Sequence, residues 1–186
     1  MQSIQCKVEK IETLTDTIKR IVLIPHSPLS FIAGQYLQVV MGENDKRPFS
    51  IANCPRDDGS LELHIGAEPG NQYAGQVIEK MQSNELINVE GGLGIAHLRQ
   101  IEPQATILLA GGSGFSYTLS ILQQLLSQPL QAPVFFYWGT RTKQDMYAFA
   151  ELETLAKQHP LLSFIPVIEK PAPDWTGKTG WVHQAV

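Results

Sequence analysis

The sequence contains few cysteines, and this scarcity excludes several classes of protein. Its 186 residues include two cysteines, Cys6 and Cys54, and no Cys-x-x-Cys pair. Neither a disulfide framework nor a cysteine-held iron–sulfur cluster is therefore expected. Free thiols fit a reducing compartment, so we expect a cytoplasmic protein. The five histidines show no metal-ligand spacing, and no metal site is expected.

Charge and long apolar runs are also scarce. Charged residues make up 17% of the chain, and the net charge of −4 leaves no basic surplus for nucleic acid. No apolar run approaches the ~18 residues that a membrane-spanning helix needs. The first twelve residues lack the apolar core of a secretory signal, so we expect neither a membrane segment nor a leader. The 43% of hydrophobic residues is enough for one large or two small globular domains.

The N-terminal half has the pattern of short strands separated by turns. Residues 18–24 are apolar and β-branched, and residues 61–65 alternate apolar and polar after a turn signal at 56–60. The candidate strands are residues 6–11, 18–24, 35–41, 47–53 and 61–65. Asn71 is a candidate N-cap for one helix. The pattern predicts an antiparallel β-barrel or sandwich, and Gly91–Gly94 is interpreted as one of its turns.

The second half alternates apolar strands with amphipathic helices. The candidate strands are residues 106–110, 134–138 and 162–168, and the candidate helices are residues 119–126 and 148–159. This β-α-β-α-β order predicts a parallel sheet. The period of the pattern changes near residues 98–104, so we predict two domains, residues 1–100 and residues 101–186.

A glycine cluster, Gly111 to Gly114, directly follows the first parallel strand. Ligands of open α/β sheets bind at this end of the strands. Glycines let the backbone approach a pyrophosphate closely, and the next helix offers free N–H groups. The spacing is not the usual G-x-G-x-x-G, so a tight turn without a ligand is the alternative.

Two other segments are candidates for ligand contacts. Arg141 ends the second parallel strand, where an arginine suits the 2′-phosphate of NADPH, and the alternative is a solvated surface arginine. The segment 47–50 combines an arginine, a proline, an aromatic and a hydroxyl in one extended stretch. Its free backbone groups suit a flat heterocycle, and the alternative is a turn at a sheet edge.

Four segments, taken in order, resemble one superfamily. They are RPFSIAN at 47–53, LHIGA at 63–67, LLAGGSGFS at 108–116 and YWGTR at 137–141. They resemble the ferredoxin–NADP reductase superfamily and, within it, the NAD(P)H–flavin reductases, including those associated with bacterial bioluminescence. The resemblance covers nearly the whole chain.

The resemblance implies an N-terminal flavin-binding barrel followed by a parallel-sheet domain for the nicotinamide dinucleotide. It implies hydride transfer from C4 of NADPH or NADH to N5 of FMN or riboflavin, with Ser50 as the catalytic hydroxyl near N5. The implied flavin-binding residues are Arg47, Pro48, Phe49, Ser50, His64, Ile65, Gly66, Ala67 and Tyr73. The implied nicotinamide-dinucleotide residues are Gly111, Gly112, Ser113, Gly114, Phe115, Tyr117 and Arg141.

The resemblance also implies that the flavin is a weakly bound substrate that leaves once reduced. Its expected recipient is a flavin-using monooxygenase of the luciferase kind. Glu68 follows the second flavin segment, and its charge should disfavour a phosphate nearby. We therefore expect riboflavin to bind at least as well as the phosphorylated flavins.

One departure and two alternatives accompany this interpretation. The superfamily continues with a further strand, a glycine loop and a helix, whereas residues 184–186 end this sequence. The α/β domain is therefore expected to lack its last strand and helix, which leaves strand 106–110 unpaired on one side. The alternatives are an electron-transfer reductase that holds its flavin tightly and serves a protein partner, and a non-catalytic flavin- or nucleotide-binding module.

Overall fold

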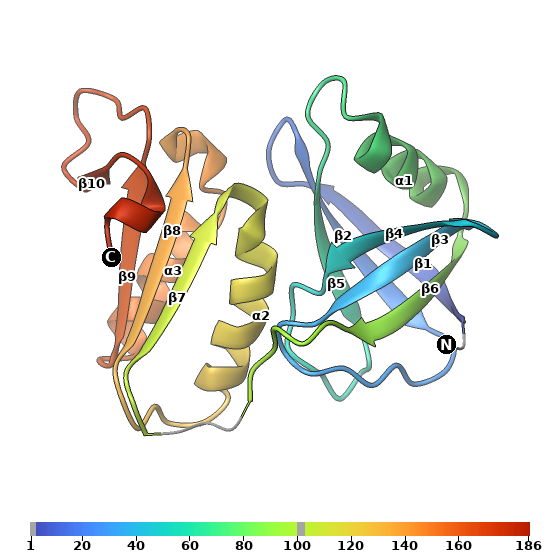
Figure 1. Ribbon diagram of the computed structural model, residues 1–186, viewed down its shortest axis with the longest axis horizontal. Coiled ribbons are helices and arrows are strands. Elements are labelled where there is room, and N and C mark those ends of the chain that lie inside the picture. Colours follow the sequence, from blue (N-terminus) through green and yellow to red (C-terminus); the bar gives the residue numbers. More distant parts are fainter. Residues whose placement is uncertain (1–2, 100–102) are drawn as a thin grey trace.

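The computed structural model describes residues 3–99 and 103–186. It contains two sheets that stand side by side in Figure 1, one antiparallel with six strands and one parallel with four. The antiparallel sheet consists of β1 (Ile4–Thr13), β2 (Ile18–Pro25), β3 (Tyr36–Gly42), β4 (Asp45–Ser50), β5 (Leu61–Gly66) and β6 (Leu86–Leu93). The parallel sheet consists of β7 (Thr106–Gly111), β8 (Val134–Thr140), β9 (Leu162–Ile168) and β10 (Lys178–Thr179). The predicted domain boundary, between residues 100 and 101, lies outside the described residues.

The antiparallel sheet curls into the predicted barrel. Its strand order is β4-β3-β6-β1-β2-β5, and the two edge strands meet again where Ile51 bridges Leu63. The Ala52 N–H donates to the Glu62 carbonyl over 2.7 Å at the same place. The apolar residues of each strand alternate inward, as period-2 patterning requires, and form one buried core.

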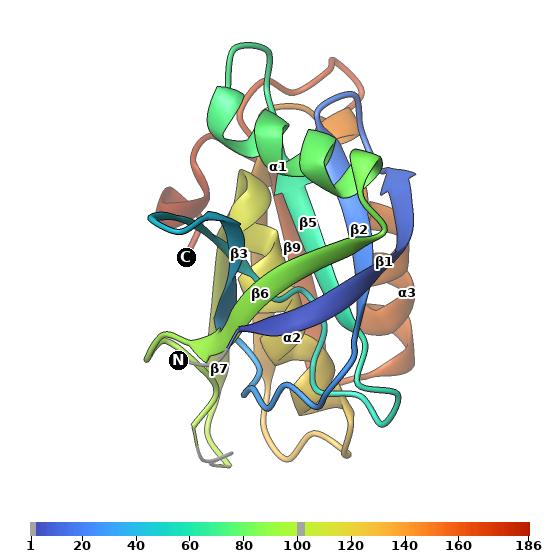
Figure 2. The same cartoon turned by 90° about the vertical axis from the view of Figure 1, so that its right-hand side faces the viewer.

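Helix α1 (Gln72–Ser83) lies across one end of this barrel (Figure 2). The Asn71 side chain accepts a hydrogen bond from the Ala74 N–H over 3.2 Å, which confirms the predicted N-cap. The helix buries its apolar stripe, including Val77 and Met81, against the barrel core.

The interpretation of Gly91–Gly94 as a turn is wrong for most of that segment. Strand β6 runs through Leu93 and pairs with both β1 and β3 inside the sheet. A Cβ atom at Gly92 would lie 2.5 Å from the Ser30 carbonyl oxygen. These glycines therefore admit a neighbouring backbone segment to the strand, which is a second reason for glycine besides a turn.

The second domain has the predicted β-α-β-α-β order, with helices α2 (Phe115–Leu126) and α3 (Phe149–Gln158). Its strand order is β10-β9-β8-β7, and all pairs are parallel. Within the described residues β7 is an edge strand, as expected. Its Ile107 and Leu109 side chains are 54% and 43% exposed.

Helix α2 joins the two domains. It lies between the parallel sheet and the barrel in Figure 1. The Ser120 hydroxyl donates to the Asn53 carbonyl over 2.7 Å and accepts from the Gly34 N–H over 3.2 Å. The Gln123 side chain accepts from the Cys54 N–H over 3.1 Å. These hydrogen bonds attach α2, the helix that follows the glycine cluster, to the barrel domain. No helix in the described part of the chain is long and apolar enough to cross a bilayer.

Candidate active site

A cleft of about 680 Å³ opens between the two domains. Four residues that the sequence predicted for ligand contacts line it together: Gly66 from the flavin segment, Gly112 and Ser113 from the glycine cluster, and Arg141. A Cβ atom at Gly66 would lie 3.9 Å from the Cβ of Ser113. Glu68, which the sequence placed near the flavin, also lines the cleft. The sequence did not indicate the other lining residues, which are Thr17, Ile18, Pro69, Asn71, Thr140 and Asp145.

The glycine cluster forms an exposed turn between β7 and α2. The Gly112 carbonyl accepts a hydrogen bond from the Trp138 indole N–H over 3.1 Å, which fixes the turn to the next strand. A Cβ atom at Gly112 or at Gly114 would meet nothing within 4 Å. The turn thus leaves room for a ligand at the N-terminal end of α2, where free N–H groups favour a phosphate.

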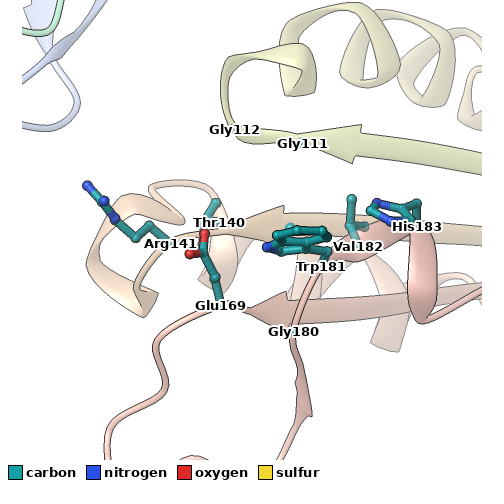
Figure 3. A pocket seen from close by; sticks show the side chains of 10 residues that line it. Gly111, Gly112, Thr140, Arg141, Glu169, Gly180, Trp181, Val182 and His183 are labelled. Carbon is teal, nitrogen blue, oxygen red and sulfur yellow. The ribbon is translucent and has the colours of Figure 1, made fainter.

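A second pocket, of about 380 Å³, lies at the carboxyl ends of β7, β8 and β9 (Figure 3). Arg141 lines this pocket as well as the cleft, so the two spaces meet at its side chain. Figure 3 shows that side chain extending away from the Glu169 carboxylate. The Glu169 N–H donates to the Thr140 carbonyl over 3.0 Å, which holds the two strand ends together. A long dinucleotide fits a continuous path of this kind.

The first predicted flavin segment lies on β4, an outer strand in the hydrogen-bonded order of the barrel sheet. Pro48 is tolerated there because an edge strand does not need every N–H. Arg47 is buried, and its guanidinium donates two hydrogen bonds to Asp45 and one to Gln76. It also lies 4.7 Å from the ring centre of Tyr73, which remains 49% exposed. Arg47 therefore braces β4 against α1.

The side chains of several other predicted site residues point into the protein. Ile65 belongs to the barrel core, and Phe115 is fully buried and stacked on Trp138 with ring centres 3.9 Å apart. Tyr117 is partly buried against the core of the second domain, and Ala67 against that of the barrel. Because their side chains are buried, Ile65 and Phe115 can contact a ligand only through their backbone atoms.

His64 lies at the junction between the domains, and both of its ring nitrogens bond to protein groups. Nε2 lies 2.9 Å from the Glu62 carboxylate and Nδ1 lies 2.8 Å from the Tyr147 hydroxyl. The Glu62 carboxylate also receives two hydrogen bonds from Arg20, over 2.9 and 2.8 Å. The sequence pattern missed this network. The alternation of β5 does place Glu62 and His64 on one face, but Tyr147 is distant in sequence.

Burial and partners oppose each other at Glu62. Burial alone would raise the pKa of this carboxyl, but the hydrogen bonds from His64 and Arg20 outweigh it and hold the pKa well below its usual range. Burial, together with the nearby Glu62 charge, raises the pKa of Tyr147. Glu62 is therefore ionised and Tyr147 keeps its proton.

Comparison with known proteins identifies the family. Residues 5–114 match an oxidoreductase FAD-binding domain, and residues 108–186 match an oxidoreductase NAD-binding domain. An NAD(P)H-flavin reductase of Aliivibrio fischeri is 50% identical over 98% of this chain and 79% of its own length. The chain belongs to the NAD(P)H–flavin reductase family. A second member of the NAD(P)H–flavin reductase family, from Vibrio harveyi, is 46% identical over 99% of this chain and 80% of its own length.

Solved structures of other reductases share this fold. The Amycolatopsis cytochrome P450 reductase GcoB superposes with a TM-score of 0.87 at 27% identity, covering 99% of this chain and 56% of its own. The cytochrome b5 reductase domain of Ulva prolifera nitrate reductase superposes at 0.83 with 16% identity, covering 97% of this chain and 78% of its own, and shows the shared fold alone.

Proposed function

We propose that this protein oxidises NADH or NADPH and reduces a free flavin, which it then releases. The observation that carries the proposal is that Gly66, from the flavin segment, and Ser113, from the glycine turn, come together at one open cleft of about 680 Å³. A flavin bound along the flavin segment and a nicotinamide bound along the glycine turn would stack in that cleft. Hydride then passes from nicotinamide C4 to flavin N5, and a proton from solvent completes the reduced flavin. The chain supplies distance and orientation for this step.

The individual site residues are part of the proposal. Ser50 ends β4 and is half-buried, which suits a hydroxyl that hydrogen-bonds the flavin near N5. The backbone of Ile65 to Ala67 would hold the flavin, and the turn from Gly111 to Gly114 would hold the pyrophosphate. We place the boundary between the two domains near residue 100, the protein in the cytoplasm, and a luciferase-like monooxygenase among the recipients of reduced flavin.

The first test is nicotinamide oxidation by the purified chain. NADH or NADPH is mixed with riboflavin in air, and the nicotinamide absorbance is followed with and without flavin. We expect a loss that depends on added flavin. A purified protein that is already yellow and passes electrons only to a protein acceptor would support the tightly bound alternative. A folded chain that oxidises neither nicotinamide would contradict the proposal.

Glu68 should set the preference among flavins. It lines the cleft together with Asp145, so a flavin phosphate placed there meets negative charge. We expect Glu68→Gln to tighten FMN binding roughly threefold at low salt while riboflavin binding stays unchanged. Flavin fluorescence quenching measures both affinities, and Glu153→Gln, on exposed α3, is the charge-matched control. Wild-type protein that copurifies with flavin adenine dinucleotide would contradict this prediction.

Arg141 should distinguish NADPH from NADH. Its exposed guanidinium lies where the two pockets meet and suits the 2′-phosphate of NADPH. We expect Arg141→Ala to raise the KM for NADPH about tenfold, the equivalent of about 1.4 kcal/mol, and to change that for NADH by less than threefold. Lys143→Ala removes the same charge nearby without touching either pocket. Equal effects on the two nucleotides would remove Arg141 from phosphate recognition.

A further inference from the structure

A directed chain of hydrogen bonds crosses the junction between the domains. The ionised Glu62 carboxylate accepts hydrogen bonds only, so His64 must carry its proton on Nε2 to bond it over 2.9 Å. In the neutral ring Nδ1 is then an acceptor, and the Tyr147 hydroxyl donates to it over 2.8 Å. Glu62 and His64 belong to the barrel, and Tyr147 belongs to the second domain. The order runs from Tyr147 through His64 to Glu62, where Arg20 binds from the other side.

An aromatic cluster continues this chain to the glycine turn. The Tyr147 ring meets His64, Phe115 and Trp138 edge-on, with ring centres 5.4, 5.4 and 5.2 Å apart. Phe115 is stacked between His64, at 6.2 Å, and Trp138, at 3.9 Å. The Trp138 indole donates to the Gly112 carbonyl. The rings from His64 to Trp138 are therefore all buried or half-buried, and the indole bond joins them to the exposed turn.

The two ends of this network lie next to the residues that line the two sides of the cleft. His64 lies two residues before Gly66 on β5, and Phe115 lies two residues after Ser113. Side chains at i and i+2 of a strand share one face, so His64 and Gly66 both face the second domain. A shift of His64 relative to Tyr147 would move Gly66 relative to the glycine turn.

We propose that His64 is a positioning residue for hydride transfer, and that its bond to Tyr147 sets the separation between the flavin strand and the glycine turn. This rests on the proposed function above. Both ring nitrogens of His64 bond to protein groups and the Tyr147 hydroxyl bonds to one of them, so neither side chain offers a free polar group to the reacting atoms. Hydride transfer needs the reacting atoms about 3–3.5 Å apart, and a misplacement of about 1 Å costs about a hundredfold in rate. A hydrogen bond across the junction therefore affects the rate far more than it affects binding.

Removing the Tyr147 hydroxyl tests the proposal. Tyr147→Phe keeps the aromatic cluster and loses only the hydrogen bond to Nδ1. We expect kcat to fall about tenfold while the KM values for flavin and nicotinamide stay within twofold. The deuterium isotope effect with C4-deuterated nicotinamide should rise, because the transfer step becomes slower. Tyr137→Phe, on β8, is the matched control, since in the described part of the chain no hydrogen bond of its hydroxyl is found.

His64→Gln gives a second, independent variant. Its amide NH2 still reaches Glu62, but its acceptor, the amide oxygen, is attached to Cδ and not to Cγ as Nδ1 is, so it does not take the place of Nδ1 opposite Tyr147. The variant should therefore reproduce the kcat loss of Tyr147→Phe. The double variant should lose no more than the larger single loss, because both changes break one bond. Thermal unfolding of each variant identifies a variant that fails to fold. Full additivity of two large losses, or unchanged kcat in both folded single variants, would overturn the positioning role.

A spectroscopic readout separates this proposal from the proposed function. Nitrogen-15 NMR of the His64 ring should show a proton on Nε2 and an Nδ1 shift that changes in Tyr147→Phe. A ring protonated at Nδ1 would overturn the directed chain whether or not the protein is active. A wild-type chain with the expected ring spectrum but no flavin-dependent nicotinamide oxidation would overturn the proposed function instead.

Discussion

Replacing Gly112 by leucine should lower kcat/KM for the nicotinamide substrate about a hundredfold, the equivalent of about 2.7 kcal/mol. Gly112 has a φ of +51°, a conformation that side chains other than glycine rarely adopt. A Cβ atom there meets no protein atom, because it would project into the open space at the start of α2. A leucine would fill the space that the proposal assigns to the pyrophosphate and would block the free N–H groups behind it.

Gly59→Leu is the matched control for this substitution. Gly59 also has a positive φ, of +68°, and a Cβ atom there also meets nothing within 4 Å. It lies in the turn before β5, away from the cleft, so it carries the same backbone strain of about 1–2 kcal/mol without the steric block. Unfolding in urea should show similar destabilisation of both variants, and steady-state kinetics should separate them. Equal kinetics would mean that no ligand group binds at Gly112.

The strands and the glycine turn were predictable because their signals are local. The alternation of residues 61–65 and the apolar run at 106–110 each reflect burial on one or both faces of a strand, and a short window of sequence contains that information. Strand β6 was missed for the opposite reason. Its glycines at 91 and 92 have the composition of a turn, whereas the structure explains them by the close approach of the Leu29 side chain to Gly91 and of the Ser30 carbonyl to Gly92, which also has a positive φ.

The residues of the candidate site also divide into those that local sequence patterns predict and those that they do not. Gly112 and Arg141 each directly follow a parallel strand, so their convergence at one end of the sheet follows from topology, and Gly66, which ends β5, joins them where the domains dock. The environment of His64 does not, because its partner Tyr147 lies 83 residues away. Local patterns report burial and turn chemistry, whereas polar networks between domains depend on how the finished domains dock. The motif alone therefore assigned His64 to the flavin, while the structure shows both of its nitrogens engaged by protein groups.

Replacing Glu62 by glutamine should lower the free energy of unfolding by about 3–5 kcal/mol, as is typical when one partner of a buried ion pair is removed. The Glu62 side chain is 6% exposed and joins Arg20, Arg56 and His64. A glutamine cannot neutralise Arg20, and its amide hydrogens face other donors. Glu12→Gln is the control, since Glu12 also pairs with Arg20 but is 35% exposed, and there we expect less than about 1 kcal/mol.

The pH dependence of this loss provides the more specific test. The pKa of Glu62 is lowered in the folded protein, so its stabilisation is present above the unfolded value of about 4.3 and is lost as the pH falls below it. Urea unfolding should therefore show the full difference between wild type and Glu62→Gln at pH 7 and a shrinking one below about pH 4. The lowered carboxyl of Asp45 shares no partner with Glu62, so its contribution cancels in the difference. Glu12 shares Arg20 with Glu62, so its contribution is removed by making the same comparison in the Glu12→Gln background. A difference independent of pH would mean that packing, rather than the charge of Glu62, holds this junction together.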